Sequence, residues 1–328
     1  FDFIVHKRVD GDFCNEIESM GGRIYLAPRK SKHPIKNLQM IADTVKENKY
    51  EIVERHSANA YSVLDLKAAK KGGATRLIFH SHSTNTGMKM VHKFFRMQMK
   101  KIPTDRFTCS DNAGKWMYGK LDYKVICNAI DIEKYAFNIG VREEVREELN
   151  LNDKHIFMHV GNLRAPKNHI FLLEYFNLIA SKDENAVLVL VGEGNERVNI
   201  EAKIDELKLS EKVMLLGVRH DIARLLQAAD IFFLPSVYEG LPVSVIEAQA
   251  AGLICLLSDV VTKDVAVTNN VHYLSLNDSY EIWADKSLTL LNESIDCFEK
   301  RKDTASIYKQ LSKAGYDVKM LAKFYENL

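Results

Sequence analysis

Apolar residues fall into short runs separated by segments of helical periodicity. Nine runs rich in strand-forming residues cover positions 24–27, 51–55, 76–80, 124–127, 155–160, 186–191, 213–216, 230–234 and 254–257. Between them, apolar side chains recur every three or four positions, which predicts helices over 38–48, 59–71, 169–181 and 221–229. Mainly apolar strands that alternate with helices indicate parallel sheets covered by helices. The pattern therefore predicts an α/β protein.

Length and charge divide this α/β chain in two. The 328 residues suffice for two domains. The net charge of +1 conceals +10 over residues 1–130 and −9 over residues 131–328. We therefore expect an N-terminal domain over 1–128 and a C-terminal domain over 129–315, with ligands bound in a cleft between them. Apolar residues at helical spacing in 316–328 predict a final helix that packs back onto the first domain.

Composition and cysteine usage narrow the class of protein. The 46% hydrophobic and 27% charged residues are typical of a globular chain and exclude a fibrous or disordered one. Five well-separated cysteines argue against a disulfide framework and for a reducing compartment: Cys14, Cys109, Cys127, Cys255 and Cys297. No signal peptide opens the chain, and the run 186–191 is far shorter than the roughly 20 residues that span a bilayer. We expect a cytoplasmic protein. Residues 1–5 read as a strand that is already under way, so we also expect that the first domain lacks its opening strand.

The segment 235–248 carries the clearest chemical signal. Gly240 permits a tight turn, and Pro242 suits the start of a helix. The amides of Leu241 and Val243 would then be free to bind an anion such as a diphosphate. Glu239 and Glu247 flank this turn, and carboxylates there are better suited to accept hydrogen bonds from sugar hydroxyls than to face a phosphate.

The same segment supports a family resemblance. It reads Ser-x-x-Glu-Gly-Leu-Pro-x4-Glu-Ala-x-Ala-x-Gly, which resembles the signature of retaining glycosyltransferases of family four. Further matches cover most of 128–265: Val160-Gly161 with Lys167-Asn168, 191–194, 217–221 and 225–230, while 21–25 and 80–82 match more loosely. The branch that builds bacterial capsular and exopolysaccharides is the most similar.

The resemblance implies a fold and a donor site. The fold is GT-B, two Rossmann-like domains that face a cleft. Glu239 is implied to hold hydroxyls of the donor sugar, Glu247 to hold the ribose hydroxyls, and the backbone around Val218 and Arg219 to contact the base. The remaining residues implied to line the nucleotide are Gly161, Gly240, Leu241 and Pro242.

A cation near Gly161 is implied to neutralise the departing diphosphate. Lys167 follows the run 155–160 and is the expected electrostatic catalyst. The family usually places an Arg directly after the Gly, whereas this chain has Asn162 there and Arg164 two residues later. Two alternatives remain: Arg164 supplies the second charge from a shifted position, or it is a solvated loop residue and one cation suffices.

Histidines end two runs of the first domain. His80 aligns best with a functional histidine of the family that hydrogen-bonds a sugar hydroxyl, with His82 as its rival. We interpret His56 as structural. Asp131-Ile132-Glu133 superficially resembles a metal-binding acidic triplet, but we interpret it as a helix start, so we expect neither a metal site nor a cofactor.

Residues 66–104 contain nine Lys or Arg and no acid. Within 88–101, a helix would align Lys89, Lys93, Arg96 and Lys100 in one stripe beside a wide apolar arc. This suits an anionic membrane surface, with a packed helix as the alternative. The family favours membrane contact, since its acceptors are commonly carried on polyprenyl diphosphate, and no motif supports nucleic-acid binding.

These observations lead to one hypothesis and two alternatives. We expect a metal-independent retaining glycosyltransferase that moves a sugar from a nucleoside diphosphate, most simply a UDP-sugar, to a lipid-linked acceptor at the inner face of the plasma membrane. One alternative is a nucleotide-sugar epimerase with the GT-B fold. The other is a non-catalytic sugar-nucleotide or membrane-binding module, since the family's opening strand and Gly-rich loop are not found in the sequence.

Overall fold

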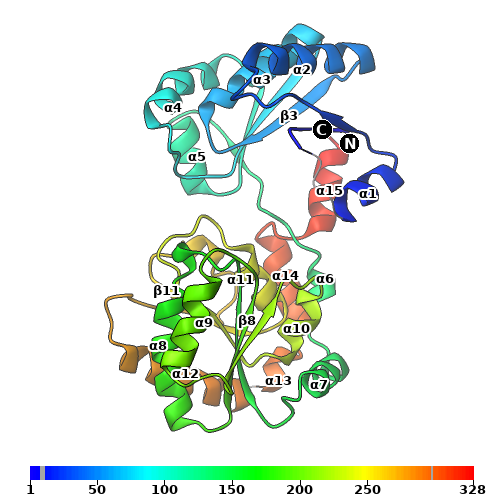
Figure 1. Ribbon diagram of the computed structural model, residues 1–328. Helices are drawn as coiled ribbons and strands as arrows, with labels where there is room; N and C mark the ends of the chain where they lie inside the picture. The colour runs from blue at the N-terminus through cyan, green and yellow to red at the C-terminus, as the bar shows by residue number, and fades with distance from the viewer. Residues whose placement is uncertain (8–11, 297) are drawn as a thin grey trace. The chain divides into compact units, whose positions relative to one another are not determined.

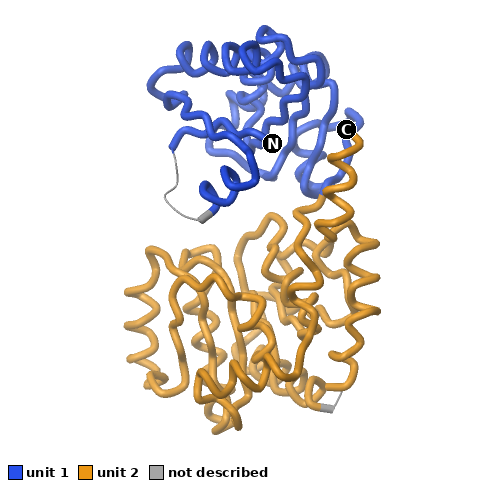
Figure 2. Tube along the Cα trace, turned by 90° about the vertical axis from the view of Figure 1, so that its right-hand side faces the viewer, with its two compact units in different colours: residues 1–126 blue, residues 127–328 orange. Residues whose placement is uncertain are grey.

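The computed structural model describes residues 1–7, 12–296 and 298–328 (Figure 1). The chain divides into two compact units, Phe1–Ile126 and Cys127–Leu328 (Figure 2). Each unit contains its own parallel β-sheet with helices packed on it. The predicted α/β class with two parallel-sheet domains is thereby confirmed.

Unit 1 is built on four parallel strands in the order β3-β4-β5-β6. The strands are β3 (Ile52–Ser57), β4 (Arg76–Ser81), β5 (Asp105–Thr108) and β6 (Lys124–Val125). A second, two-stranded parallel sheet pairs β1 (Phe3–Val5) with β2 (Ile24–Leu26). The helices are α1 (Asp12–Ser19), α2 (Pro34–Asn48), α3 (Val63–Gly72), α4 (Lys89–Arg96) and α5 (Asp111–Tyr118).

The strand β5 was not predicted from the sequence. Three of its four residues are polar (Asp105, Arg106 and Thr108), so no apolar run marks it. The strand pairs with β4 on one side and with β6 on the other, and its Asp105 forms a two-point ion pair with Arg76 of β4, with both N···O distances at 3.1 Å.

The segment 88–101 differs from the continuous helix that its spacing predicts. The helix α4 ends at Arg96, and a 3₁₀ turn over Met97–Lys100 follows. Arg96 donates from Nε to the carbonyl oxygen of Met117 in α5 at 3.1 Å. Its guanidinium is therefore bound to the protein and does not extend the basic stripe of Lys89, Lys93 and Lys100. Met99 is buried, whereas the apolar side chains Met88, Met90, Phe94 and Met97 are exposed.

Unit 2 is built on six parallel strands in the order β12-β11-β10-β7-β8-β9. The strands are β7 (His155–Val160), β8 (Ala186–Val191), β9 (Val213–Gly217), β10 (Ile231–Leu234), β11 (Ile254–Ser258) and β12 (Val271–Leu274). The helices are α6 (Ile132–Tyr135), α7 (Ile139–Glu148), α8 (His169–Lys182), α9 (Arg197–Glu206), α10 (Ile222–Ala228), α11 (Val243–Ala250), α12 (Tyr280–Asp296), α13 (Phe298–Arg301), α14 (Thr304–Lys313) and α15 (Val318–Glu326).

Helices cover both faces of the six-stranded sheet. Along β8, Val187 and Val189 join the core beneath α10 and α11, while Leu188 and Leu190 join the core beneath α8 and α12. Figure 1 shows these two helical layers on opposite sides of the sheet. Because both faces are buried, most positions of β7 to β11 are apolar, which is why the hydrophobic pattern predicted these five strands. The pattern did not predict β12.

Arginines anchor the end of the sheet where β10 begins. Asp230 accepts from Arg142 at 2.5 Å and from Arg146 at 2.7 Å, and its Oδ2 also accepts from the amide of Ile156 at 2.7 Å. The buried Arg301 donates to carbonyl oxygens at the end of α10 at 2.7–3.2 Å, and to the carbonyl oxygen of Ala251, which follows α11, at 2.8 Å. These guanidinium groups bond carbonyls that α10 cannot satisfy internally.

Several other expectations concern the ends and the thiols of the chain. A β-bridge between Ile130 and Asp317 places the start of α15 beside the start of unit 2, and the packing of 316–328 onto the first domain stays a prediction.

Four cysteines are free thiols, and Cys297 lies outside the described residues. Every described helix is too short or too polar to cross a bilayer.

Candidate active site

Two adjacent strands of unit 2 carry the central residues. Because β7 pairs directly with β10, the loops that follow their carboxyl ends meet. Lys167 lies in a 3₁₀ turn, Ala165–Lys167, and Glu239 lies in the loop after β10. Backbone bonding joins the two loops, with the amide of Val237 donating to the carbonyl oxygen of Pro166 at 2.9 Å.

Lys167 and Glu239 form an ion pair. Lys167 Nζ lies 2.5 Å from Glu239 Oε1, and Ser236 Oγ donates to the same oxygen at 2.8 Å. The two side chains are only 14% and 13% exposed, so water screens their charges weakly. A charged site this dry, at the carboxyl edge of a parallel sheet, is suited to an anionic ligand with hydroxyl groups.

Two buried histidines lie near this ion pair. A Cβ at Gly161 would lie 3.1 Å from His159 Nε2 and 3.2 Å from Lys167 Cε, so a side chain at Gly161 would crowd both residues. Burial and the Lys167 charge lower the pKa of His169 to about 4, and burial chiefly lowers the pKa of His159. Both rings are therefore neutral at neutral pH, and Lys167 is the positive charge beside Gly161.

The loop after β8 lies directly against the loop after β7. A Cβ at Gly192 would lie 2.0 Å from the carbonyl oxygen of Gly161, and one at Gly194 would lie 2.1 Å from that of Leu163. Gly192 also has φ of +141°, which disfavours other residues. The two glycines thus allow close packing of these loops, in agreement with a tight strand-to-helix turn.

The helix α11 begins after the Gly240-Leu241-Pro242 turn, as predicted, and Pro242 directly precedes it. On its second turn, the half-buried Glu247 accepts from Tyr135 Oη at 2.7 Å. Burial raises the pKa of the Glu247 carboxyl, although the hydrogen bond from Tyr135 lowers it. Nothing in the sequence indicated Tyr135, because α6 lies more than 100 residues earlier.

The loop after β9 lies two strands from β7. Val218 is 63% exposed there. Arg219 forms a bidentate pair with Asp221 at 2.8 and 2.7 Å, and this pair lowers the pKa of Asp221 to about 2. The side chain of Arg219 is thus already engaged, which agrees with a role for the backbone at this position.

The structure brings some of the residues predicted from the sequence together in unit 2. Lys167, Glu239 and Gly161 lie together, and Arg164 is exposed at the start of the same 3₁₀ turn. Sequence reasoning did not single out Ser236, although it lies within the quoted signature.

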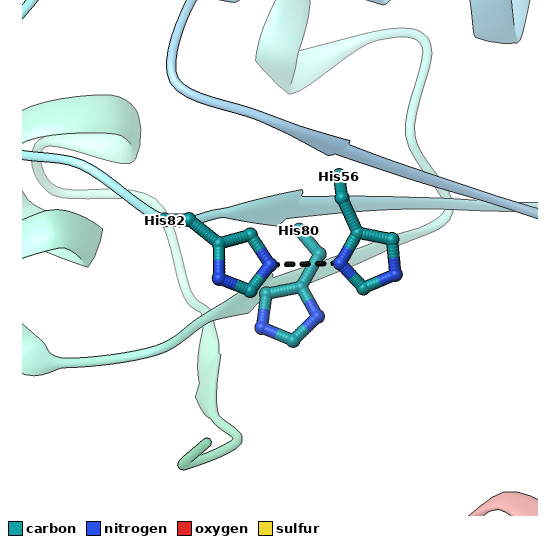
Figure 3. Close-up of side chains that lie close together, drawn as sticks. All are labelled: His56, His80 and His82. Carbon is teal, nitrogen blue, oxygen red and sulfur yellow. Dashed lines mark hydrogen bonds between the residues drawn. The ribbon is translucent and has the colours of Figure 1, made fainter. Parts of the chain in front are cut away.

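His80 belongs to unit 1 and lies in a histidine cluster. It is buried on β4, beside His56 of β3 and His82 (Figure 3). The sequence pattern favours a structural role for His56 and does not indicate Glu54, which contacts His80. The signal for this cluster is Glu-x-His followed by His-x-His, which becomes meaningful only once β3 and β4 pair.

Comparison with known proteins gives a family match. Residues 141–310 match the family model of the glycosyl transferases group 1. EpsF of Bacillus subtilis is 30% identical over 97% of this chain and 85% of its own length. The Escherichia coli UDP-Gal:α-D-GlcNAc-diphosphoundecaprenol α-1,3-galactosyltransferase is 28% identical over 85% of this chain and 78% of its own length.

Solved structures show the same fold. Anabaena Alr3699/HepE in complex with UDP aligns with a TM-score of 0.79 over 100% of this chain and 92% of its own, at 17% identity. A glycosyltransferase from Rickettsia africae aligns with a TM-score of 0.78 over 99% and 88%, at 18% identity. Together with the family match, the sheet order and the signature around Glu239 and Glu247, these similarities show that the chain belongs to the group 1 glycosyl transferases and has their GT-B fold.

Proposed function

We propose that this protein is a retaining glycosyltransferase that uses a UDP-sugar and a polyprenyl-diphosphate-linked acceptor in the assembly of a surface polysaccharide. The observation that carries the proposal is the poorly solvated Lys167–Glu239 ion pair beside Gly161. The E. coli relative supports the substrate classes, because its name specifies UDP-Gal and a diphosphoundecaprenol-linked sugar.

Unit 2 would hold the donor. An incoming diphosphate competes with Glu239 for Lys167, and the amides of Leu241 and of Val243, the first residue of α11, add hydrogen-bond donors for its oxygens. Glu239, released from Lys167, accepts hydrogen bonds from sugar hydroxyls, and Glu247 accepts them from the ribose. The base lies along the backbone of Val218 and Arg219.

Unit 1 would take the acceptor. In the transfer step, the bond from the anomeric carbon to the diphosphate oxygen breaks. The acceptor oxygen forms its bond to that carbon on the same face, and its proton passes to the departing diphosphate. Lys167 stabilises the negative charge that develops there.

A thermal-shift titration with UDP-glucose, UDP-galactose and their N-acetyl forms tests the donor class. We expect at least one UDP-sugar to raise the Tm of the full chain, because a ligand that binds only the folded state stabilises it. Incubation of that donor without acceptor should yield no epimer by NMR, and an epimer would instead establish the epimerase. If no nucleotide sugar shifts the Tm, the proposed donor site is wrong.

Glu247→Gln separates binding from folding in the same titration. The raised pKa of Glu247 means that its ionised form disfavours folding at neutral pH, and this cost disappears with Gln. The unliganded variant should therefore unfold at the wild-type Tm or above it, yet show a much smaller shift with the UDP-sugar. An unchanged ligand-induced shift would contradict the ribose role.

We further propose that the exposed face of α4 and its 3₁₀ turn contacts an anionic membrane. Lys89, Lys93 and Lys100 are exposed there. They lie near the exposed apolar side chains of Met88, Met90, Phe94 and Met97. Basic and apolar groups on one short segment are typical of helices at lipid headgroups.

Charge reversal tests this surface by vesicle sedimentation. Lys89→Glu, Lys93→Glu and Lys100→Glu together should weaken binding to phosphatidylglycerol vesicles by about 3–5 kcal/mol in total at low salt. The matched control reverses three exposed lysines of α3, Lys67, Lys70 and Lys71, with the same change in net charge. Equal losses in both variants would show that net charge alone drives the binding.

A further inference from the structure

Two paired strands of unit 1 bring three histidines and a glutamate to one face of the sheet. His56 on β3 lies directly opposite His80 on β4 in the parallel register. Side chains two residues apart on a strand share a face of the sheet. Glu54 therefore lies on the same face as His56, and His82, just past the end of β4, lies on the same face as His80. Figure 3 shows the three rings gathered at this point.

The ring nitrogens are spaced closely enough to share one ligand. His56 Nδ1 lies 2.7 Å from His82 Nε2, and the ring centroids of His80 and His82 lie 4.3 Å apart. One nitrogen from each of the three histidines lies within 4.8 Å of the other two. With this spacing, small movements of the side chains would allow the three nitrogens to bind a single ion.

Glu54 fixes the orientation of the most buried ring. Its Oε1 accepts from His80 Nδ1 at 2.8 Å, which leaves the lone pair on His80 Nε2. That atom is buried, and among the described residues it has no hydrogen-bond partner. A buried acceptor without a partner is unfavourable, and a histidine oriented through its other nitrogen by a carboxylate is the usual arrangement of a metal ligand.

From this geometry we infer that His56, His80 and His82 bind one divalent transition-metal ion of the Zn²⁺ class, with Glu54 as the positioning residue for His80. Imidazole ligands favour Zn²⁺, Co²⁺ and Ni²⁺ over Mg²⁺ or Ca²⁺. Tetrahedral coordination requires ligand nitrogens about 3.3 Å apart, so His56, whose side chain is 55% exposed, must withdraw slightly from His82. The sequence predicted no metal site because the ligands converge only through strand pairing.

The site is tested by metal titration of the full, tag-free chain after chelator treatment and dialysis. Calorimetry with ZnCl₂ should show one ion bound per chain, and CoCl₂ should give the visible absorption of a tetrahedral nitrogen site. His56→Asn and His82→Asn should each weaken Zn²⁺ binding by more than about tenfold, and Glu54→Gln should weaken it by about 10–100-fold.

His33→Asn is the matched control, because His33 is an exposed histidine of the same unit and should bind no ion in this site. Circular dichroism verifies that each variant is folded. The inference is overturned if the wild-type chain binds no Zn²⁺, or if the double variant His56→Asn/His82→Asn binds it as tightly as wild type does. Neither donor nor acceptor is present, so this result is independent of the proposed transfer reaction.

Discussion

Lys167→Met is expected to lower the kcat of sugar transfer by about 10²–10³-fold, the usual loss when one preorganised group that stabilises developing charge is removed. Lys167 is the positive charge beside Gly161, since burial keeps His159 and His169 neutral. Methionine retains much of the side-chain length and apolar contact but cannot neutralise the departing diphosphate. Release of UDP in the presence of acceptor is the measurement.

The way in which the kinetic constants change decides the role of Lys167. Loss in kcat shows that the charge acts mainly in the transition state, whereas a raised KM with unchanged kcat would mean that Lys167 only binds the donor. Lys309→Met, at an exposed lysine of the same unit, controls for loss of a positive charge and should leave both constants unchanged. An active Lys167→Met enzyme would transfer the role to Arg164, the alternative left open by the sequence.

Glu239→Gln is expected to reduce kcat/KM by about a hundredfold or more, because each hydrogen bond from a sugar hydroxyl to the charged carboxylate contributes about 1.5–3 kcal/mol. The substitution keeps the shape of the side chain and a carbonyl oxygen that can accept from Ser236. It removes the charge that pairs with Lys167 at 2.5 Å and that strengthens hydrogen bonds to sugar hydroxyls. Initial rates over a range of donor concentrations give kcat/KM.

The double variant Lys167→Met/Glu239→Gln tests whether the two residues act together. Contacting residues couple, so its loss should be smaller than the product of the two single losses. Glu211→Gln, at an exposed position of unit 2, should retain wild-type rates. Wild-type turnover by Glu239→Gln in a folded protein would refute the donor site around this ion pair.

The fold was predictable wherever burial determines residue type. The strands β7, β8 and β10 are buried on both faces, so their sequences are almost purely apolar. The strand β5 was missed because it is mostly polar, and the charge of its Asp105 is balanced by Arg76 from a neighbouring strand. Local sequence contains no information about that partner.

The site was predictable only in part, for a similar reason. The signature around Glu239 is continuous in sequence and could be read directly, as could the turn before α11. Tyr135 and the pairing of His56 with His80 depend on contacts between distant segments. Periodicity also gave the wrong environment for Arg96, because spacing describes a helix face but not the carbonyls that the face contacts.

The arginines around Asp230 have a consequence for ligand affinity. They secure the amino ends of β7 and β10, whereas Lys167 and Glu239 follow the carboxyl ends of the same strands. The backbone that carries both charges is therefore ordered before any ligand arrives. Less conformational entropy remains to be lost on binding, and this preorganisation allows a few polar contacts to give usable affinity.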